Sequence, residues 1–341
     1  MQVEAFLIDE WLGTDDAIPI TDEASVSAAR ERARHVARSQ EMNAVDGARL
    51  ATIASELGYN HLKHARYGQI AVRPITRGKH RGVEISAADR GEGIADPTRA
   101  LHGVARGTGS LGTGLAALRE LADELDIDVR IREGTFIRAR LFDGEPPRRR
   151  EVGVYGRPYR DEPVSGDHAC MFRGDDRLVV CVCDGLGHGA PARVAASSAM
   201  RVFVEKQTGA PQAIIEACHE GLAGTRGAVM AVVSVAEGGP QNLELAAVGN
   251  ITVQLVEPRA ERRFGASSFV VGAPQRGWRP HLETSAIETS QMLILFTDGI
   301  ESRASINEDL ALLRGHPITI AHHLVERFAR DSDDVLVLVA R

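Results

Sequence analysis

Residues 178–189 read LVVCVCDGLGHG, and this stretch decides how the second half of the chain folds. An unbroken apolar run of this length, rich in valine, predicts one buried strand that ends at Asp184. The glycines that follow it (Gly185, Gly187 and Gly189) let other backbone approach closely at the strand end. A carboxylate held rigidly beside such backbone suits a hard divalent cation, which binds carboxylate and carbonyl oxygen alike. The stretch therefore predicts a central strand with a metal-binding end.

The same junction of aspartate and apolar strand occurs twice more. The apolar run 292–296 (MLILF) leads into Thr297, Asp298 and Gly299, and Asp333 with Asp334 precedes the run VLVLVA. Taken singly, each junction is a strand-terminating turn, because Asp-Gly is among the commonest turn dipeptides. Three of them in one half of the chain predict a single convergent site of oxygen ligands for a metal.

The bulk composition limits the function classes. A chain of 341 residues predicts two domains, and a net charge of -7 argues against nucleic acid as the principal partner. No apolar run approaches the ~20 residues that span a bilayer, so we expect no membrane partner and no signal peptide. The four cysteines lack the spacing of a zinc site or a disulfide framework. We therefore expect a protein of the reducing cytoplasm.

The first half of the chain mixes helices and strands. Thr21 and Asp22 are typical helix caps and precede a charged amphipathic helix, and the segment 44–65 has apolar residues at helical spacing. This pattern predicts an α+β sandwich. The other expected elements are a strand near residue 18, strands 69–74, 82–87, 128–132 and 135–142, and a helix over 115–125.

A polar, proline-rich stretch, DGEPPRRR at 143–150, separates two compositions and predicts a linker over 144–150. The expected domains are 1–143 and 151–341. Many strands with few helices follow the linker, which predicts two packed sheets flanked by helices. The expected strands are 152–157, 168–173, 178–183, 228–236, 243–248, 251–256, 292–296 and 335–339, and the expected helices are 190–206, 211–222 and 317–329.

Two short polar motifs in the first half could serve a ligand. Glu56 and Asn60 stand four residues apart in a helix and so share one face, although an isolated pair of this kind is usually a solvated surface. Asp89, Gly91 and Gly93 alternate at the end of an expected strand. Neither motif is specific alone.

The segment 107–114, GTGSLGTG, has the glycine density of a phosphate-cradling loop that opens into a helix. It is not a P-loop, because the terminal Lys-Ser/Thr is missing, and no βαβ unit precedes it as in a dinucleotide site.

Taken in order, these motifs resemble the GHKL ATPase fold and, more closely, the anti-sigma-factor serine kinases of that superfamily, over residues 18–142. The resemblance implies a GHKL-type α/β sandwich that binds ATP with Mg²⁺. It implies that Glu56 is the catalytic base toward a protein hydroxyl, that Asn60 holds Mg²⁺ and that Asp89 reads the adenine amino group. The remaining nucleotide contacts it implies are Gly91, Gly93, Gly107, Thr108, Gly109, Ser110, Leu111, Gly112, Thr113 and Gly114.

One pair of residues departs from this family pattern. Many of these kinases carry Ala-Arg between the glutamate and the asparagine, where this chain has Gly58 and Tyr59. If that arginine assists transfer, the domain binds ATP while phosphorylating slowly.

The second half resembles the metal-dependent serine/threonine phosphatases of the bacterial sporulation and stress-response branch. The resemblance rests on SGD at 165–167, DGLGHG at 184–189, VGN at 248–250, FTDGI at 296–300 and the paired aspartates before the last strand. It implies a four-layer α-β-β-α sandwich with two Mn²⁺ or Mg²⁺ ions that activate water.

The resemblance also implies a role for each ligand. Asp184 bridges the two ions at the catalytic centre, Gly185 offers its carbonyl, and Asp298 and Asp333 complete the shell. Asp167 is an outer or third-metal ligand.

Some roles in this half stay open. Asp334 is the alternative to Asp333. His188 is either a general acid or an imidazole held beside the glycine turn for structural reasons. The family usually has a threonine two residues after the second aspartate, where this chain has Leu336.

Together, the two resemblances imply a bifunctional signalling protein: an ATP-dependent serine/threonine kinase joined to an opposing phosphatase. The expected partner is a STAS-domain protein, either an anti-anti-sigma factor or a stressosome component, within a sigma-factor regulatory network. A homodimer is left open. The alternative is a phosphatase regulated by an N-terminal domain that senses ATP and docks partners without catalysis.

Overall fold

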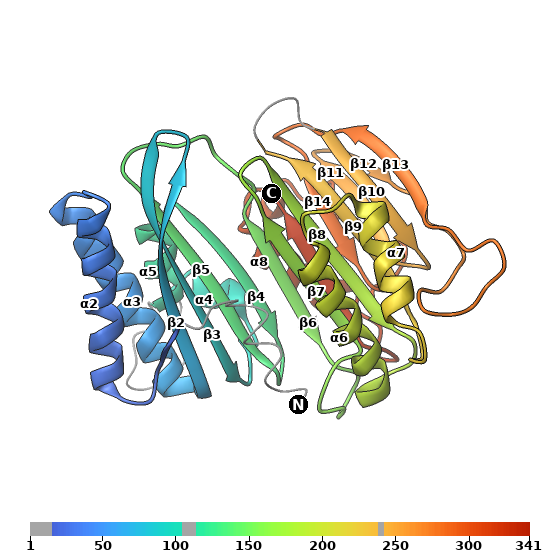
Figure 1. Ribbon diagram of the computed structural model, residues 1–341, viewed down its shortest axis with the longest axis horizontal. Helices are drawn as coiled ribbons and strands as arrows, with labels where there is room; N and C mark the ends of the chain where they lie inside the picture. The colour runs from blue at the N-terminus through green and yellow to red at the C-terminus, as the bar shows by residue number, and fades with distance from the viewer. Residues whose placement is uncertain (1–15, 104–113, 238–241) are drawn as a thin grey trace. The chain divides into compact units, whose positions relative to one another are not determined.

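The computed structural model of the chain describes residues 16–103, 114–237 and 242–341. It divides into two compact units, Met1–Glu151 and Val152–Arg341. In Figure 1 the first unit runs from blue to green and the second from green to red.

The strands of the N-terminal unit form one antiparallel sheet in the order β1-β2-β3-β5-β4. Helices α2 and α3 pack on each other and against β2 and β3, and α5 packs on α3, so the helices cover one side of the sheet (Figure 1). The strands are β1 (Ile18–Pro19), β2 (Ala65–Arg77), β3 (His80–Gly91), β4 (Glu124–Arg130) and β5 (Gly134–Phe142). The helices are α2 (Glu23–Ser39), α3 (Ala44–His64), α4 (Pro97–Leu101) and α5 (Gly114–Leu121).

The expected caps start the first two helices. The Asp22 carboxylate accepts from the Ser25 N–H at 2.8 Å, and the Ser25 hydroxyl oxygen accepts from the Asp22 N–H at 3.1 Å, which forms a capping box. The Asn43 side chain accepts from the Asp46 N–H at 2.9 Å at the start of α3. These bonds fix where each helix begins.

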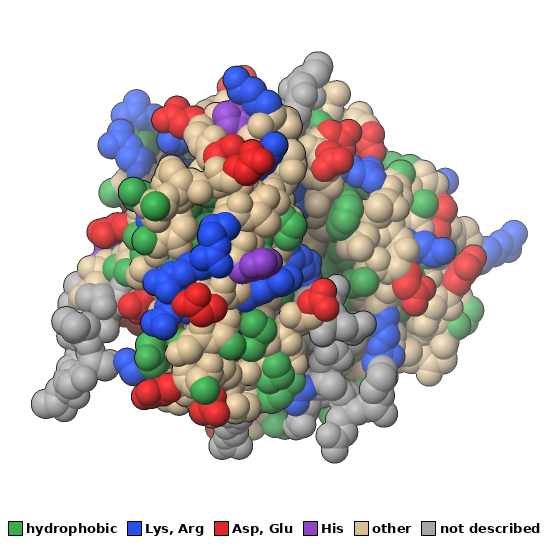
Figure 2. Space-filling view, turned by 60° about the vertical axis from the view of Figure 1, so that its left-hand side comes forward, with side chains coloured by type: hydrophobic (Ala, Val, Ile, Leu, Met, Phe, Trp, Pro, Cys, Tyr) green, Lys and Arg blue, Asp and Glu red, His purple; other side chains and the backbone are tan. Residues whose placement is uncertain are grey.

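The outer face of α2 is strongly charged. Arg32, Arg34, His35 and Arg38 are exposed, and Arg34 donates to Glu31 at 2.7 Å. On the face turned forward in Figure 2, basic side chains gather beside a histidine with acidic side chains among them. The charged amphipathic helix expected from the sequence is therefore confirmed, with its apolar stripe buried.

The C-terminal unit is a sandwich of two antiparallel sheets. Their orders are β6-β15-β14-β11-β12 and β13-β10-β9-β8-β7. The strands are β6 (Val152–Arg157), β7 (Asp167–Arg173), β8 (Arg177–Gly185), β9 (Ala228–Ala236), β10 (Asn242–Val248), β11 (Thr252–Glu257), β12 (Ala260–Arg263), β13 (His281–Ala286), β14 (Met292–Phe296) and β15 (Val335–Ala340).

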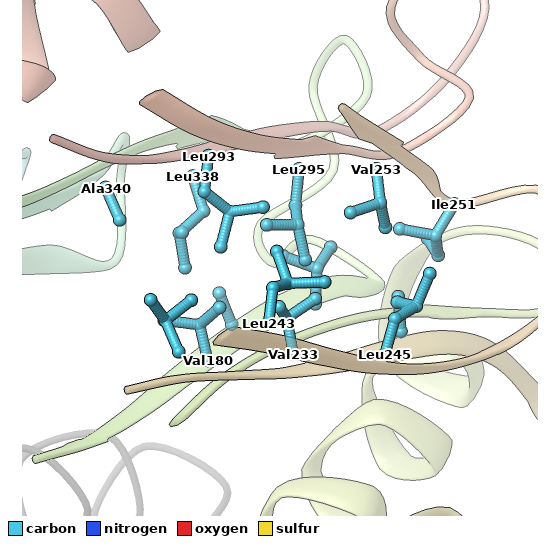
Figure 3. Close-up of a cluster of buried hydrophobic side chains, with 14 of the residues drawn as sticks. Val180, Val233, Leu243, Leu245, Ile251, Val253, Leu293, Leu295, Leu338 and Ala340 are labelled. Carbon is cyan, nitrogen blue, oxygen red and sulfur yellow. The ribbon is translucent and has the colours of Figure 1, made fainter. Parts of the chain in front are cut away.

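Aliphatic side chains from both sheets fill the space between them (Figure 3), and among them Val180, Val233, Leu293 and Leu338 are fully buried. The helices are α6 (Gly189–Lys206), α7 (Pro211–Gly221) and α8 (Pro317–Phe328). Helices α6 and α7 pack on the sheet of β7–β10, and α8 packs on β6 and β15. The predicted fold class is confirmed: an α+β sandwich followed by a four-layer α-β-β-α sandwich.

Some predicted elements were wrong in their limits. The helix predicted to reach residue 125 ends at Leu121, because the next residues join the sheet: Leu125 pairs with Ala139, and Glu124 receives bonds from Arg77 and Arg140. Helix α4 and the edge strands β12 and β13 were not predicted. The residues of β12 are all exposed and those of β13 alternate in burial, so neither carries an apolar run.

The predicted linker, 144–150, contains no helix or strand. It is nevertheless bonded to the N-terminal unit, since Arg77 donates to the Pro147 carbonyl at 3.1 Å. The Leu125 N–H donates to the Glu151 carboxylate at 2.7 Å, just beyond it. Domain limits at 143 and 151 stay a prediction.

None of the helices that the structure describes combines the length and hydropathy needed to cross a membrane.

Candidate functional sites

A cavity of about 680 Å³ opens in the N-terminal unit, bounded by α3, β3, α4, β5 and the start of α5. It collects the predicted residues Glu56, Asn60, Asp89 and Gly114, together with Gly91 and Gly93. Its walls also include the apolar side chains of Leu57, Ala87, Ile94, Leu115 and Ile137. Charged, polar and apolar groups therefore all reach this cavity.

Glu56 and Asn60 lie where α5 begins. A Cβ atom on Gly114 would stand 3.2 Å from the Glu56 Oε2 atom and 3.3 Å from the Asn60 side-chain amide. The first turn of α5 therefore lies directly beside these two side chains. The N–H groups of a helix start favour anionic groups such as phosphate at this end of the cavity.

Asp89 is held at the end of β3. Its Oδ1 atom accepts from the Gly91 N–H at 2.7 Å. Burial raises the pKa of Asp89 to about 6, although hydrogen bonds from the Gly91 and Thr135 backbone oppose this rise. Gly91 has no room for a side chain, because a Cβ atom would stand 2.8 Å from the His64 carbonyl oxygen. Gly93 has a φ of +76°, which favours glycine.

His61 also lines this cavity and was not predicted. It is only 4% exposed, and its Nε2 atom lies 3.8 Å from the Asp89 carboxylate. Burial lowers the pKa of His61 to about 4, so the ring is neutral at physiological pH. The sequence signal was its place beside Asn60, but a buried histidine is recognisable only once β2 is packed against α3.

The glycine-rich segment contributes one described residue, Gly114. The other predicted nucleotide contacts, Gly107, Thr108, Gly109, Ser110, Leu111, Gly112 and Thr113, lie outside the described residues.

A second cavity, of about 460 Å³, opens at one end of the C-terminal sandwich. Asp184 at the end of β8, Asp298 after β14 and Asp333 before β15 all line it. The three strand-end aspartates are thus brought to one site. Asn250 and His188 line the same cavity.

The charges of these carboxylates act on one another. Burial and the charges of Asp298 and Asp333 raise the pKa of Asp184 to about 8. Burial and the charge of Asp298 also raise the pKa of Asp333. Carboxylates placed so that they repel one another form a site that a cation stabilises.

Asp167 stands behind this group and does not line the cavity. It pairs with Asp184 across β7 and β8, and its Oδ2 atom accepts from the Thr297 hydroxyl at 2.7 Å. Burial and the Asp184 charge raise the pKa of Asp167 well above its usual range. Thr297 also accepts from the Leu336 N–H at 3.0 Å, so its hydroxyl ties β15 to Asp167. This role of Thr297 was missed in the sequence, although the residue was noted.

The geometry distinguishes the two aspartates that precede β15. Asp334 is buried, and its carboxylate accepts from the Tyr159 N–H at 2.6 Å and the Gly166 N–H at 2.8 Å. Asp333 lines the cavity and accepts from the Asp334 N–H at 2.9 Å. The arrangement favours Asp333 as the cavity ligand and Asp334 as a backbone anchor.

Asn250 and His188 are positioned by acidic partners. The Asn250 amide donates to the Asp298 Oδ2 atom at 2.8 Å, and the Nδ1 atom of His188 lies 3.0 Å from the Glu162 Oε1 atom. His188 also precedes α6, and its ring packs against Tyr159 at 5.2 Å between centroids. The two readings of His188 are compatible, because the ring is held in place and also faces the cavity.

Oxygen donors at a strand tip fit Mn²⁺ or Mg²⁺ in kind. Gly185 is tightly packed, since a Cβ atom there would stand 2.1 Å from the Ala192 carbonyl oxygen. No three of the described His, Cys, Asp and Glu side chains stand close enough together to hold one ion. A cation at this cavity would therefore need carbonyl oxygen or water in addition to these carboxylates.

Two family models match the chain. The histidine kinase-like ATPase domain matches residues 19–141, and Stage II sporulation protein E matches residues 174–341. The first match contains Glu56, Asn60 and Asp89, and the second contains Asp184, Asp298 and Asp333.

Individual proteins match as well. The serine/threonine-protein kinase RsbT of Bacillus subtilis is 33% identical over 128 residues, which is 38% of this chain and 96% of RsbT. A solved chain from work on the bacterial stressosome, a modular system adapted to control secondary messenger signaling, is 28% identical with a TM-score of 0.53. It covers 57% of this chain and 100% of its own. A crystal structure of RsbX in complex with magnesium shares the fold, with 22% identity, a TM-score of 0.50 and coverage of 57% and 96%.

Proposed function

The chain belongs to the histidine kinase-like ATPase family through its N-terminal unit and carries a Stage II sporulation protein E domain in its C-terminal unit, and we propose that it is a bifunctional signalling enzyme. The N-terminal unit transfers phosphate from ATP to a serine or threonine of a partner protein. The C-terminal unit removes it again in a reaction that requires Mn²⁺ or Mg²⁺.

The observation that carries the phosphatase half is the convergence of Asp184, Asp298 and Asp333 on one cavity. Bound divalent cations would neutralise phosphoryl charge and make water more acidic. The three carboxylates would hold the cations together with carbonyl oxygen and water, and Asn250 fixes the orientation of Asp298. The Glu162–His188 pair places an imidazole at the cavity, where it can serve the departing hydroxyl.

The kinase half is supported by the cavity that holds Glu56, Asn60 and Asp89. Asp89 provides a charged acceptor for the adenine amino group, and Asn60 lies beside the α5 start, where the phosphates and Mg²⁺ would sit. Glu56 is the base for the incoming hydroxyl. Phosphoryl transfer depends mainly on positioning and charge neutralisation, which these residues can provide.

The partner we propose is a STAS-domain protein of a sigma-factor regulatory network, an anti-anti-sigma factor or a stressosome component. The likeness to RsbT and to a chain from work on the bacterial stressosome supports this class.

Hydrolysis of p-nitrophenyl phosphate tests the phosphatase half. It should require Mn²⁺ or Mg²⁺ and fall below detection in Asp184→Asn, because a cation site that loses one carboxylate is underligated. Asp331→Asn is the matched control, because Asp331 is fully exposed and two residues from Asp333 in the sequence but does not line the cavity. Undiminished hydrolysis in EDTA would refute this half.

A second function for the N-terminal unit is favoured by Tyr59. This side chain lines the nucleotide cavity at the position where many of the kinases carry arginine, and it is 42% exposed. On this alternative the unit binds ATP and docks the partner without transferring phosphate. Labelled γ-phosphate that appears on the STAS partner supports the kinase, whereas ATP binding without transfer supports the sensor.

A further inference from the structure

One loop of the C-terminal unit reaches the cavity of the three aspartates although it contributes no acidic group. Residues 264–280 connect β12 in one sheet to β13 in the other. Within this loop Ser268 and Phe269 line the cavity together with Asp184 and Asp298. Neither residue has an ionisable side chain, so the loop brings a different kind of group to the cavity from the aspartates.

The loop is clamped to the sheet on both sides of these residues. On one side Ser267 forms a bridge to Val248, with its carbonyl accepting from the Gly249 N–H at 2.7 Å. On the other side Val271 exchanges two backbone hydrogen bonds with Ala228, at 2.8 and 3.0 Å. The segment Ser267–Val271, which we name the arch, therefore has a short and defined course.

A second layer of contacts supports the arch from outside the cavity. The Trp278 indole N–H donates to the Val270 carbonyl at 3.0 Å, and the Gln275 side chain accepts from the Val270 N–H at 2.9 Å. The Trp278 ring stacks on His219 of α7, with centroids 3.7 Å apart and planes at 23°. His219 in turn accepts from the Gly272 N–H at 3.1 Å. Helix α7 thus holds the arch in place.

The lining of the cavity combines apolar side chains with the three aspartates and a few other polar groups. Leu186 lines the cavity and is 37% exposed, and Phe269 is half-buried. Among the described residues that line the cavity there is no lysine or arginine. These lining side chains provide no cationic partner for an acidic residue of the substrate, whereas Leu186 and Phe269 provide apolar surface on which an apolar residue could pack.

We propose that the arch is the substrate-recognition element of the phosphatase site, with Phe269 and Leu186 binding an apolar side chain next to the phosphorylated serine of the protein substrate. His219 and Trp278 are positioning residues that hold Phe269 at the cavity. The inference rests on the proposed phosphatase function. Every phosphoester carries the phosphate that the aspartates and their cations would bind. Selectivity among protein substrates therefore requires groups that contact the residues beside the phosphoserine.

The experiment uses three substrates with the full chain: p-nitrophenyl phosphate and two phosphoserine heptapeptides that differ only in having Leu or Asp after the phosphoserine. We expect the wild type to favour the Leu peptide. Phe269→Ala should raise the KM for the Leu peptide about tenfold, in line with the loss of one apolar contact, and raise the KM for p-nitrophenyl phosphate by a smaller factor, because that substrate has no flanking side chain. Leu282→Ala is the matched control, because Leu282 is 49% exposed on β13 and does not line the cavity.

Trp278→Leu tests the positioning role. It should raise the KM for the Leu peptide with little change in kcat, and Trp278→Phe, which keeps an aromatic ring to stack on His219, should recover part of the loss. If Trp278→Leu fails to fold, Phe269→Ala still tests the proposal, because Phe269 is partly exposed and its truncation should leave the fold intact. Equal changes for all three substrates in Phe269→Ala, or no wild-type preference for Leu, would overturn the inference. Failure of the wild type to hydrolyse even p-nitrophenyl phosphate would instead refute the phosphatase itself.

Discussion

Ionisation of the Asp89 carboxyl group has opposite effects on the stability of the protein and on nucleotide binding. Burial raises its pKa from 3.8 to about 6, so the protonated form suits the folded protein better. Its contribution to the free energy of unfolding is fully present below pH 3.8 and is lost as the pH rises through about 6. The full shift corresponds to at most about 3 kcal/mol. Nucleotide binding needs the charged acceptor and should strengthen over the same range.

We therefore predict that ATP affinity, measured by calorimetry on the full chain, rises between pH 5 and 7, while amide protection of β3 falls. Asp89→Asn should flatten both profiles and weaken ATP binding about tenfold, because a neutral amide is a weaker acceptor than a carboxylate. An affinity that is independent of pH in the wild type would contradict the assignment of Asp89 to the adenine amino group.

The Thr297 hydroxyl is the second residue whose role can be isolated. It donates to the buried Asp167 and accepts from the Leu336 N–H, so it connects the sheet to the carboxylate behind Asp184. Thr297→Val removes the donor while keeping the shape. We expect the apparent Mn²⁺ affinity, read from p-nitrophenyl phosphate hydrolysis, to fall about 10- to 100-fold. Thr297→Ser retains the hydroxyl and should stay near the wild type; equal losses in both variants would argue for packing alone.

Helix α3 positions Glu56 and Asn60 only while it stays in close contact with α2. A Cβ atom on Gly58 would stand 2.9 Å from two methyl carbons of Val26, which accounts for a glycine at this position. On the same helix, a Cβ atom on Gly47 would be 3.9 Å from the Ala37 side chain and fits.

The pair of glycines provides a matched test. Gly58→Ala should destabilise the α2–α3 contact by about 1–3 kcal/mol through overpacking, and Gly47→Ala should stabilise α3 by about 0.5–1 kcal/mol through helix propensity. Amide hydrogen exchange of α3 in the full chain measures both. Equal effects of the two variants would show that α2 and α3 do not touch as described.

The helices and strands also show how much of the structure could be predicted from the sequence. Asp184 and Asp298 were found because a long apolar run that ends on Asp-Gly is a local signal. Helix α5 was predicted too long, because Glu124 and Leu125 suit a helix locally but are drawn into β4 by pairing with β5. The edge strand β12 escaped prediction because strand pairing, and no apolar pattern, defines it.

The sequence also could not predict functional contacts between side chains that lie far apart along the chain. Thr297 meets Asp167 across 130 positions, and His61 approaches Asp89 only through the packing of α3 on the sheet. The three aspartates could be predicted to converge, yet the choice of Asp333 over Asp334 needed the Tyr159 and Gly166 backbone bonds. Register and side-chain direction, which tertiary packing decides, account for each of these cases.

At the scale of the whole molecule, the chain joins an ATPase-family unit to a phosphatase-type unit in one polypeptide, and our account assigns them opposed activities on one partner. Joining the two in one polypeptide fixes their ratio at one to one. The phosphorylation level at steady state then depends on the ratio of two rates and is independent of enzyme concentration. Nucleotide binding at the Asp89 cavity could adjust that ratio.

The measurement that tests this account most directly is the level of phosphate on a STAS-domain partner incubated with the full chain, ATP, Mg²⁺ and Mn²⁺. We predict a partial plateau for the wild type that does not change with enzyme concentration. Asp184→Asn should raise the plateau to complete phosphorylation, because removal is abolished, and Glu56→Ala should reduce it to none. A partner that stays unphosphorylated with Asp184→Asn, although the protein binds ATP, would contradict the kinase assignment and leave the N-terminal unit as a sensor.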